Sequence, residues 1–369
     1  MDHTQYSFKI PQEIWEHVIE LVDDESALKT FLTASPHLRA HITILSVKLS
    51  HLGQLAELGL PNVRDLRLSG RSGLWGLGSL DRVHIGGVDR WAALTAFPRL
   101  RNLHIHDDSL TALEFIGLLR PLPPISCIGL HSISWLDDGA TEPLARSSGP
   151  PVGLRLTELR IEEGDGLDTL EHFMSLTFTG DVILALEKLS LDVVPTQAWI
   201  TATNALMQRN NIHSLWFGRF QNISRHTSFL DFSGLHALHD LTVELSLPIN
   251  YTPDLLRNLS SSVATINSLT LNPFVIVLRL MNRMLINDGL IDEIFGEIGA
   301  ALAKPPFRRL TELRIQFPDP KTSFILPGPR PNASRSIDRH FGAIKEQGVA
   351  VKLFTGNSPD VSRASSIIG

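Results

Sequence analysis

The sharpest metal-like cluster of the chain is the five-residue run His104-Ile105-His106-Asp107-Asp108. Imidazole and carboxylate groups are zinc ligands, and alternate residues of a β-strand point to the same face, so His104 and His106 would lie side by side on a strand. This spacing raises a minor alternative, a metal-dependent enzyme. The other interpretation is that both histidines are ordinary polar positions of a strand, and that Asp107 and Asp108 cap the helix that follows.

No other side chains suggest catalysis. Cys127 is the single cysteine and lies between Ile125 and Ile128, an apolar setting in which thiols are usually unreactive packing residues. The chain has no GxSxG motif and no glycine-rich phosphate-binding loop between a strand and a helix. We therefore expect no catalytic residue, no bound metal and no cofactor, and we expect that the protein is not an enzyme.

Composition narrows the class further. The 369 residues are 43% hydrophobic and 20% charged, which is typical of a foldable soluble protein. The net charge is −6 and no basic block is present, so nucleic acid and acidic lipid are not expected partners. The chain shows no apolar signal or membrane-spanning stretch, and the single cysteine fits a reducing compartment. These features predict a cytoplasmic or nuclear protein.

The elements that position these residues are indicated by a recurring pattern, LxxLxL, in which an apolar residue, two variable residues and two further apolar residues follow one another. Individual copies are weak signals, but many copies in order resemble an irregular leucine-rich repeat. Clear copies are Val63-Leu66-Leu68, Leu80-Val83-Ile85, Leu100-Leu103-Ile105, Leu156-Leu159-Ile161, Leu186-Leu189-Leu191, Ile212-Leu215-Phe217, Leu238-Leu241-Val243, Ile266-Leu269-Leu271 and Leu310-Leu313-Ile315, and weaker copies are Ile44-Val47-Leu49 and Ile125-Ile128-Leu130.

Each copy predicts one short strand of a parallel sheet, with the stretches between copies forming helices on the outer side. The fold class is thus α/β, a solenoid with the parallel sheet inside and the helices outside. A degenerate repeat is expected between residues 271 and 313, around residues 277–280. The predicted helices cover residues 110–119, 167–176, 198–207, 253–259, 290–303 and 337–346, and a closing strand covers residues 349–354.

A different pattern occupies the N-terminus. Pro11 suits the first position of a helix, and apolar residues then follow at three- and four-residue spacing, as on one face of an amphipathic helix. Three short helices are expected within residues 8–42, too few to form a core of their own. Ile10-Pro11, Glu13-Ile14-Trp15, Ile19, Leu28 and Phe31-Leu32 resemble the fungal form of the F-box.

The F-box resemblance implies that these helices bind the Skp adaptor of a Skp-cullin-F-box (SCF) ubiquitin ligase, and through Skp a cullin. The alternative is that the N-terminal helices only cap the repeats, in which case Trp15 and Ile19 would pack against the first repeats. The residues expected to contact Skp are Ile10, Pro11, Ile14, Trp15, Val18, Ile19, Leu28, Phe31 and Leu32.

In the repeats, the polar residues that alternate with the buried ones should form a solvent-facing stripe on the concave side of the sheet. A partner protein would bind there. Trp216 is the strongest candidate, because tryptophan is enriched at interface hot spots, although packing beneath a loop or helix is an equal alternative. The candidate substrate-binding residues are Arg67, His84, His104, His106, Arg160, Glu162, Trp216, Glu244 and Arg314.

The predicted organisation is an F-box-like helical domain at residues 1–43, a leucine-rich-repeat solenoid at residues 44–354 and a disordered tail at residues 355–369. The predicted function is a substrate-recognition adaptor of an SCF ubiquitin ligase that acts by proximity. A leucine-rich-repeat scaffold for protein interactions, without a role in a ubiquitin ligase, is the alternative from another class.

Overall fold

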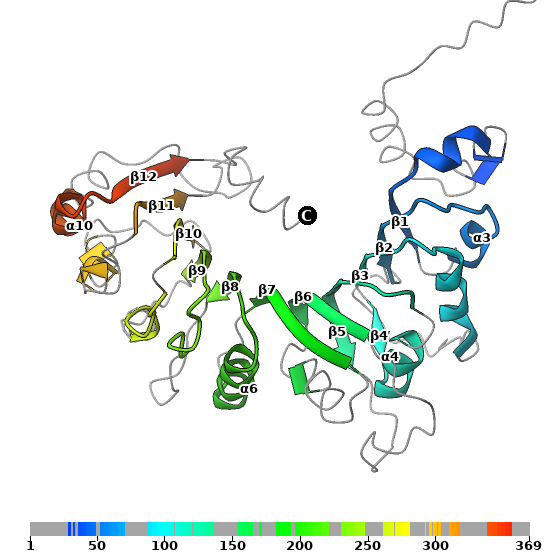
Figure 1. The fold of residues 1–369 in the computed structure, drawn as a ribbon, viewed down its shortest axis with the longest axis horizontal. Helices are drawn as coiled ribbons and strands as arrows, with labels where there is room; N and C mark the ends of the chain where they lie inside the picture. The colour runs from blue at the N-terminus through cyan, green and yellow to red at the C-terminus, as the bar shows by residue number, and fades with distance from the viewer. Residues whose placement is uncertain are drawn as a thin grey trace, which may run out of the picture. The chain divides into compact units, whose positions relative to one another are not determined.

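The fold is given by a computed structural model of the whole chain (Figure 1). Two compact units are present, residues 1–156 with 178–183 (unit 1) and residues 157–177 with 184–369 (unit 2). The residues that the structure describes are 29–30, 32–33, 36–48, 52–70, 88–106, 108–119, 122–135, 154–164, 170–171, 182–192, 196–220, 230–247, 261–268, 270–280, 292, 295–296, 298–300, 302–303, 310–317 and 338–355.

Unit 1 contains a parallel sheet in which β1, β2, β3 and β5 pair in that order, and a short strand, β4, pairs with the end of β5. The register aligns the apolar motif positions, so that Leu66 of β2 lies beside Leu45 and Leu103, and all three are buried. The strands are β1 Ile44–Lys48, β2 Asp65–Ser69, β3 Asn102–His106, β4 Ser109–Leu110 and β5 Cys127–Trp135.

Helical segments cover the apolar side of the unit 1 sheet (Figure 1). The helix α4 begins with a capping box, in which Thr111 Oγ1 accepts a hydrogen bond from the Glu114 N–H and Glu114 Oε2 accepts one from the Thr111 N–H. The prediction that Asp108 caps this helix is therefore wrong, because its Oδ1 accepts from the Ser109 N–H instead. The segments are the 3₁₀ helices η1 Pro36–His41 and η3 Val88–Ala96 and the α-helices α3 Leu52–Ala56 and α4 Ala112–Leu119.

Unit 2 contains a second run of parallel strands in chain order from β7 to β12, with β6 beside β7. The first residues of β6 and β7, 154–156 and 182–183, are counted in unit 1. Leu215 and Phe217 of β8 are buried, whereas Trp216 between them lies on the other face, which confirms the predicted register of this strand. The strands are β6 Leu154–Gly164, β7 Val182–Asp192, β8 Ser214–Phe220, β9 Asp240–Leu247, β10 Phe274–Leu280, β11 Glu312–Phe317 and β12 Ala350–Thr355.

The outer layer of unit 2 includes α6 Gln197–Gln208 and α10 Gly342–Glu346. Thr196 caps α6, since its Oγ1 accepts a hydrogen bond from the Trp199 N–H at 3.2 Å. Asn210, just beyond α6, donates to the Leu206 carbonyl and accepts from the Leu186 N–H at the start of the LxxLxL copy in β7. One amide side chain thereby fastens the helix to the sheet.

A backbone ladder starts one or two residues before the strands, at the second position of the motif. In unit 1, Arg64 donates its N–H to the Thr43 carbonyl, and Arg101 donates to the Arg64 carbonyl. In unit 2, His239 donates to the His213 carbonyl, and Asn272 donates to the His239 carbonyl. The same motif position therefore forms the first hydrogen bond between successive repeats.

The backbone ladder and the strand register show that two of the predicted motif copies were misplaced. The copy predicted at Ile266-Leu269-Leu271 is not a strand, because the Ser268 and Thr270 hydroxyls donate to the Leu238 carbonyl and hold this segment before the sheet begins. The strand copy is instead Leu271-x-x-Phe274-x-Ile276, and Phe274 and Ile276 lie beside Leu241 and Val243.

At the N-terminal edge, the predicted copy Ile44-Val47-Leu49 is displaced by two residues. Ile44 is 50% exposed, while Ile42, Leu45 and Val47 are buried and supply the apolar positions. The copies beginning at Val63, Leu100, Leu156, Leu186, Ile212, Leu238 and Leu310, and the weaker one at Ile125, are confirmed by strands at their last apolar positions, whereas Leu80-Val83-Ile85 lies outside the described residues.

Several other predictions also fall outside the described part of the chain. Of the Skp-binding residues, Leu32 is described and fully buried, and the remaining eight lie outside the described residues, as do residues 253–259 and the tail after residue 355. Among the residues that the structure describes, no helix is long and apolar enough to cross a membrane.

Candidate functional site

The sheet of each unit has an apolar face turned to the core and a second face, which we call the polar face. With the motif numbered from its first apolar residue, positions 3, 5 and 7 occupy the polar face, because positions 4 and 6 are buried. The register aligns equal positions, so that Arg67, His104 and Gly129 lie side by side at position 5 of three successive repeats in unit 1.

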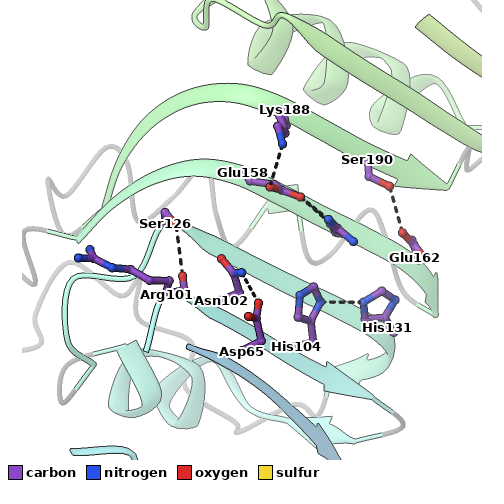
Figure 2. A network of polar contacts seen from close by, with 11 residues as sticks. Asp65, Arg101, Asn102, His104, Ser126, His131, Glu158, Glu162, Lys188 and Ser190 are labelled. Atoms are coloured by element: carbon purple, nitrogen blue, oxygen red, sulfur yellow. Dashed lines mark hydrogen bonds and ion pairs between the residues drawn. The ribbon is translucent and has the colours of Figure 1, made fainter. Parts of the chain in front are cut away.

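Three histidines form a cluster on the polar face of unit 1, here called the imidazole cluster (His104, His106 and His131). His104 Nδ1 lies 3.4 Å from His131 Nε2, and the rings of His106 and His131 stack with centroids 4.2 Å apart and an interplanar angle of 5°. Figure 2 shows the His104 and His131 rings turned toward each other from β3 and β5.

Gly129 makes the imidazole cluster possible. It lies beside His104 in the register, and a Cβ at this position would overlap His104 Nδ1. Without that Cβ, the His104 ring extends over β5 and reaches His131, two residues further along the same strand. A side chain of any other residue would displace the His104 ring.

Arg67 is exposed at the edge of the imidazole cluster and forms no hydrogen bond or ion pair with any other described residue. The nearby carboxylate on the same strand, Asp65, does not pair with Arg67. It accepts a hydrogen bond from the Asn102 amide on β3 (Figure 2). The guanidinium of Arg67 thus remains available on this face.

The hexapeptide Leu-Thr-Glu-Leu-Arg-Ile occurs twice, at residues 156–161 and 310–315, and places a glutamate at position 3 and an arginine at position 5, all four of these residues in unit 2. In the first copy, Arg160 Nη2 lies 2.5 Å from Glu158 Oε1, and Lys188 Nζ of the next strand lies 4.0 Å from Glu158 Oε2. Figure 2 shows Lys188 turned toward Glu158, the glutamate that both cations share.

The second copy repeats this arrangement. Arg314 Nε lies 2.7 Å from Glu312 Oε1, and Lys352 Nζ of β12 lies 3.1 Å from the same oxygen. The hydrogen bond from Arg314 lowers the pKa of Glu312 from its ordinary value of 4.5, more than partial burial raises it. Each copy of the hexapeptide therefore forms an ion-paired network within the polar face.

Trp216 lies on the polar face at position 5 of β8, between Ser190 of β7 and Thr242 of β9. Its indole ring extends over Gly218, where a Cβ would overlap both the ring and Asp192 Oδ1. The ring is half-buried. Trp216 is therefore not packed into the core, and its ring lies next to a carboxylate.

Several candidate residues are less accessible than the sequence predicts. His104 and Arg160 are each 8% exposed and Glu244 is 4% exposed, so the expectation that these side chains face solvent is wrong. Neighbouring side chains cover them: Glu158 of the same strand bonds to Arg160, and His131 of the adjacent strand lies against His104. Arg67 is exposed; His106, Glu162, Trp216 and Arg314 are half-buried, and His84 lies outside the described residues.

Metal-binding geometry is not present in the described part of the chain. No group of three or more His, Cys, Asp or Glu side chains there is arranged to hold a metal ion. Asp107 lies outside the described residues, and Cys127 is a buried free thiol. Among the side chains that the structure describes, the imidazole cluster is thus a group of neighbouring rings without the ligand set of a zinc site.

Sequence reasoning missed several residues of the polar face, although a signal was present for some of them. His131 stands at position 7 of its motif, the same position as His106, so alignment of the repeats would have placed the two together. The duplicated hexapeptide likewise marks Glu158 and Glu312 as partners of the arginines two residues further on. Lys188 and Lys352 lie on the strands next to Glu158 and Glu312, so they follow from the strand order.

Similarity to known proteins is found among solved structures. No protein-family model and no curated protein matches the chain. Among solved structures, the leucine-rich repeat-containing protein LegL7 from Legionella pneumophila is similar, with 16% identity, coverage of 82% of this chain and 91% of that chain, and a TM-score of 0.43. The parallel strands, their register and the outer helices define a leucine-rich-repeat-like fold within each unit.

Proposed function

We propose that the chain is a scaffold that binds another protein through the polar face of its sheet. The observation that supports this most is Trp216, a half-buried tryptophan on the polar face of a sheet whose other face is filled by core residues. Tryptophan at such a position supplies a large apolar contact area, and repeat proteins present extended binding surfaces. Binding and positioning of a partner require no catalytic group.

The test is proximity labelling in cells, followed by binding of the purified full-length chain to the protein recovered. Trp216→Ala should weaken that binding at least tenfold, as expected for a hot-spot residue. Ile183→Ala removes another exposed apolar side chain and serves as the matched control. Equal affinity of both variants for every recovered protein would contradict binding through Trp216.

The more specific proposal is that the scaffold is the substrate adaptor of an SCF ubiquitin ligase. It is supported by the F-box-like pattern of residues 8–42, whose spacing predicts an amphipathic helix with Trp15 and Ile19 on its apolar side. The segment would bind Skp, and through Skp a cullin, while the polar face of the repeats holds the substrate. Ubiquitin transfer would follow from proximity.

The described end of this segment favours the capping alternative for its last part. Leu32 is fully buried, and Arg39 donates from Nε to the Leu32 carbonyl and from Nη1 to the Leu58 carbonyl, both at 2.9 Å. Asn62 donates to the Ala40 carbonyl at 2.6 Å. Arg39 and Ala40 are thus hydrogen-bonded to the first repeat, and Skp binding rests on the residues before Leu32.

A binding titration of the purified chain with purified Skp distinguishes the two roles. If the segment is an F-box, the chain binds Skp, and the double variant Trp15→Ala, Ile19→Ala abolishes binding. The double variant Glu16→Gln, His17→Gln changes the polar side of the same predicted helix and should leave binding unchanged. Absence of binding by the unmodified chain would leave the capping role alone.

A further inference from the structure

Arginine occupies position 5 of the motif in three strands, with an acidic residue at position 3 each time. Arg160 and Arg314 are bonded to the glutamates two residues before them, whereas Arg67 forms no bond to Asp65. Aspartate is one methylene shorter than glutamate, and the Asn102 amide already donates to Asp65. Because Asp65 is shorter than the glutamates and has another partner, the guanidinium of Arg67 remains available, unlike those of Arg160 and Arg314.

The surroundings of Arg67 carry donors and positive charge. His104 lies beside Arg67 in the register, the rest of the imidazole cluster follows on β3 and β5, and Lys48 stands at position 7 of β1. Among the described polar-face positions of β1, β2, β3 and β5, Asp65 is the one carboxylate. This part of the face therefore has an excess of cationic and N–H donor groups over acidic ones.

We propose that Arg67 and the imidazole cluster bind a carboxylate side chain of an acidic segment of the partner protein. The proposal rests on the proposed scaffold function and names the chemistry of its partner. The guanidinium supplies a planar fork of donors that matches a carboxylate, and the neighbouring imidazoles supply further donors. In unit 2, Glu158 and Glu312 already fill this role for Arg160 and Arg314.

The test uses the purified full-length chain and a fluorescein-labelled hexaglutamate peptide, with hexaglutamine and hexalysine peptides as controls. Fluorescence anisotropy at low salt should detect binding of hexaglutamate and of neither control. Arg67→Ala should weaken binding at least tenfold, because a charge-assisted hydrogen bond to the carboxylate is lost. Arg314→Ala is the matched control, since that arginine is already paired with Glu312.

Asp65→Glu tests the mechanism without removing any cation. The longer carboxylate should bind Arg67 within the strand, as Glu312 binds Arg314, and should weaken hexaglutamate binding toward the level of Arg67→Ala. Circular dichroism confirms that both variants are folded. Equal hexaglutamate affinity of the Arg67→Ala and Arg314→Ala variants would overturn the proposal, as would tighter binding of a phosphoserine peptide of equal net charge or of anionic lipid vesicles.

The outcomes separate this proposal from the scaffold function. If hexaglutamate does not bind but the cellular partner binds and depends on Trp216, the carboxylate site is wrong and the scaffold function stands. If hexaglutamate binds through Arg67 but no recovered partner depends on the polar face, the scaffold function is wrong and the carboxylate site stands.

Discussion

The polar faces of the two units differ in how they treat arginine at the same motif position. In unit 2, Arg160 and Arg314 are engaged by glutamates within their own strands, and lysines of the following strands complete each network. In unit 1, Arg67 is exposed and borders three clustered imidazoles. The comparison teaches that arginines at the same motif position differ in pairing where the acidic residue at position 3 differs in length and in partner, as Asp65 with its Asn102 amide differs from Glu158 and Glu312.

The cores of the two units should lose similar stability when a buried leucine is truncated. Leu66 of unit 1 and Leu313 of unit 2 are both fully buried at position 4 of their motifs. Truncation of either to alanine should lower the free energy of unfolding by about 2–5 kcal/mol, through lost burial and a residual cavity. Urea denaturation measures the loss. A much smaller loss at Leu66 than at Leu313 would mean that the units differ in packing as well as in surface chemistry.

Replacement of the arginine at position 5 should change the unfolding free energy by different amounts in the two units. Arg160→Ala should cost about 1–3 kcal/mol of unfolding free energy, because it removes a buried, charged hydrogen-bond donor from Glu158. Arg67→Ala should change the unfolding free energy by less than about 0.5 kcal/mol, as is usual for an exposed side chain without such bonds. Urea denaturation of the two single variants in the same buffer measures both losses of unfolding free energy. Equal losses would contradict the expected difference between Arg160 and Arg67.

The smallest effect concerns the pH dependence of unit 2. The pKa of Glu312 is lowered in the folded chain, chiefly by the Arg314 hydrogen bond, so its contribution to stability is complete above the ordinary value of 4.5. That contribution is lost as the pH falls through the lower folded-state pKa. Glu312→Gln should therefore reduce the unfolding free energy by about 1 kcal/mol or less at pH 7 and by a smaller amount at pH 3.

Urea titrations of the unmodified chain and the Glu312→Gln variant at both pH values test this sign. Asp65→Asn, at the equivalent position of unit 1, is the matched comparison, because Asp65 has an amide partner in place of a guanidinium. A difference for Glu312→Gln that grows at acid pH would contradict the assigned pairing with Arg314.

Strand positions were predictable from the sequence because the LxxLxL pattern follows directly from alternating burial in a strand. The pattern failed where apolar residues with the same spacing are buried in a segment that precedes the strand. Ile266 and Leu271 are buried and fit the spacing, but Ser268 and Thr270 bond to the Leu238 carbonyl, so the strand begins only at Phe274. The sequence spacing alone cannot distinguish these two uses of an apolar residue.

Exposure on the polar face was less predictable, because it depends on the length and partner of each neighbouring side chain. Arg67 and Arg160 follow the same local pattern, yet one is exposed and the other is 8% exposed. The imidazole cluster likewise depends on Gly129, which a list of polar positions does not include. Alignment of the repeats by register supplies this information, whereas the pattern of single strands does not.

The backbone ladder at motif position 2 has a consequence for how the repeats tolerate change. Each rung joins one residue of a repeat to the same residue of the next, for example Arg101 to Arg64 and His239 to His213, however many residues lie between them. The alignment of the strands is consequently reset at every rung. An insertion or deletion in an outer segment would change that segment alone. The register of the strands in the following repeats would be preserved.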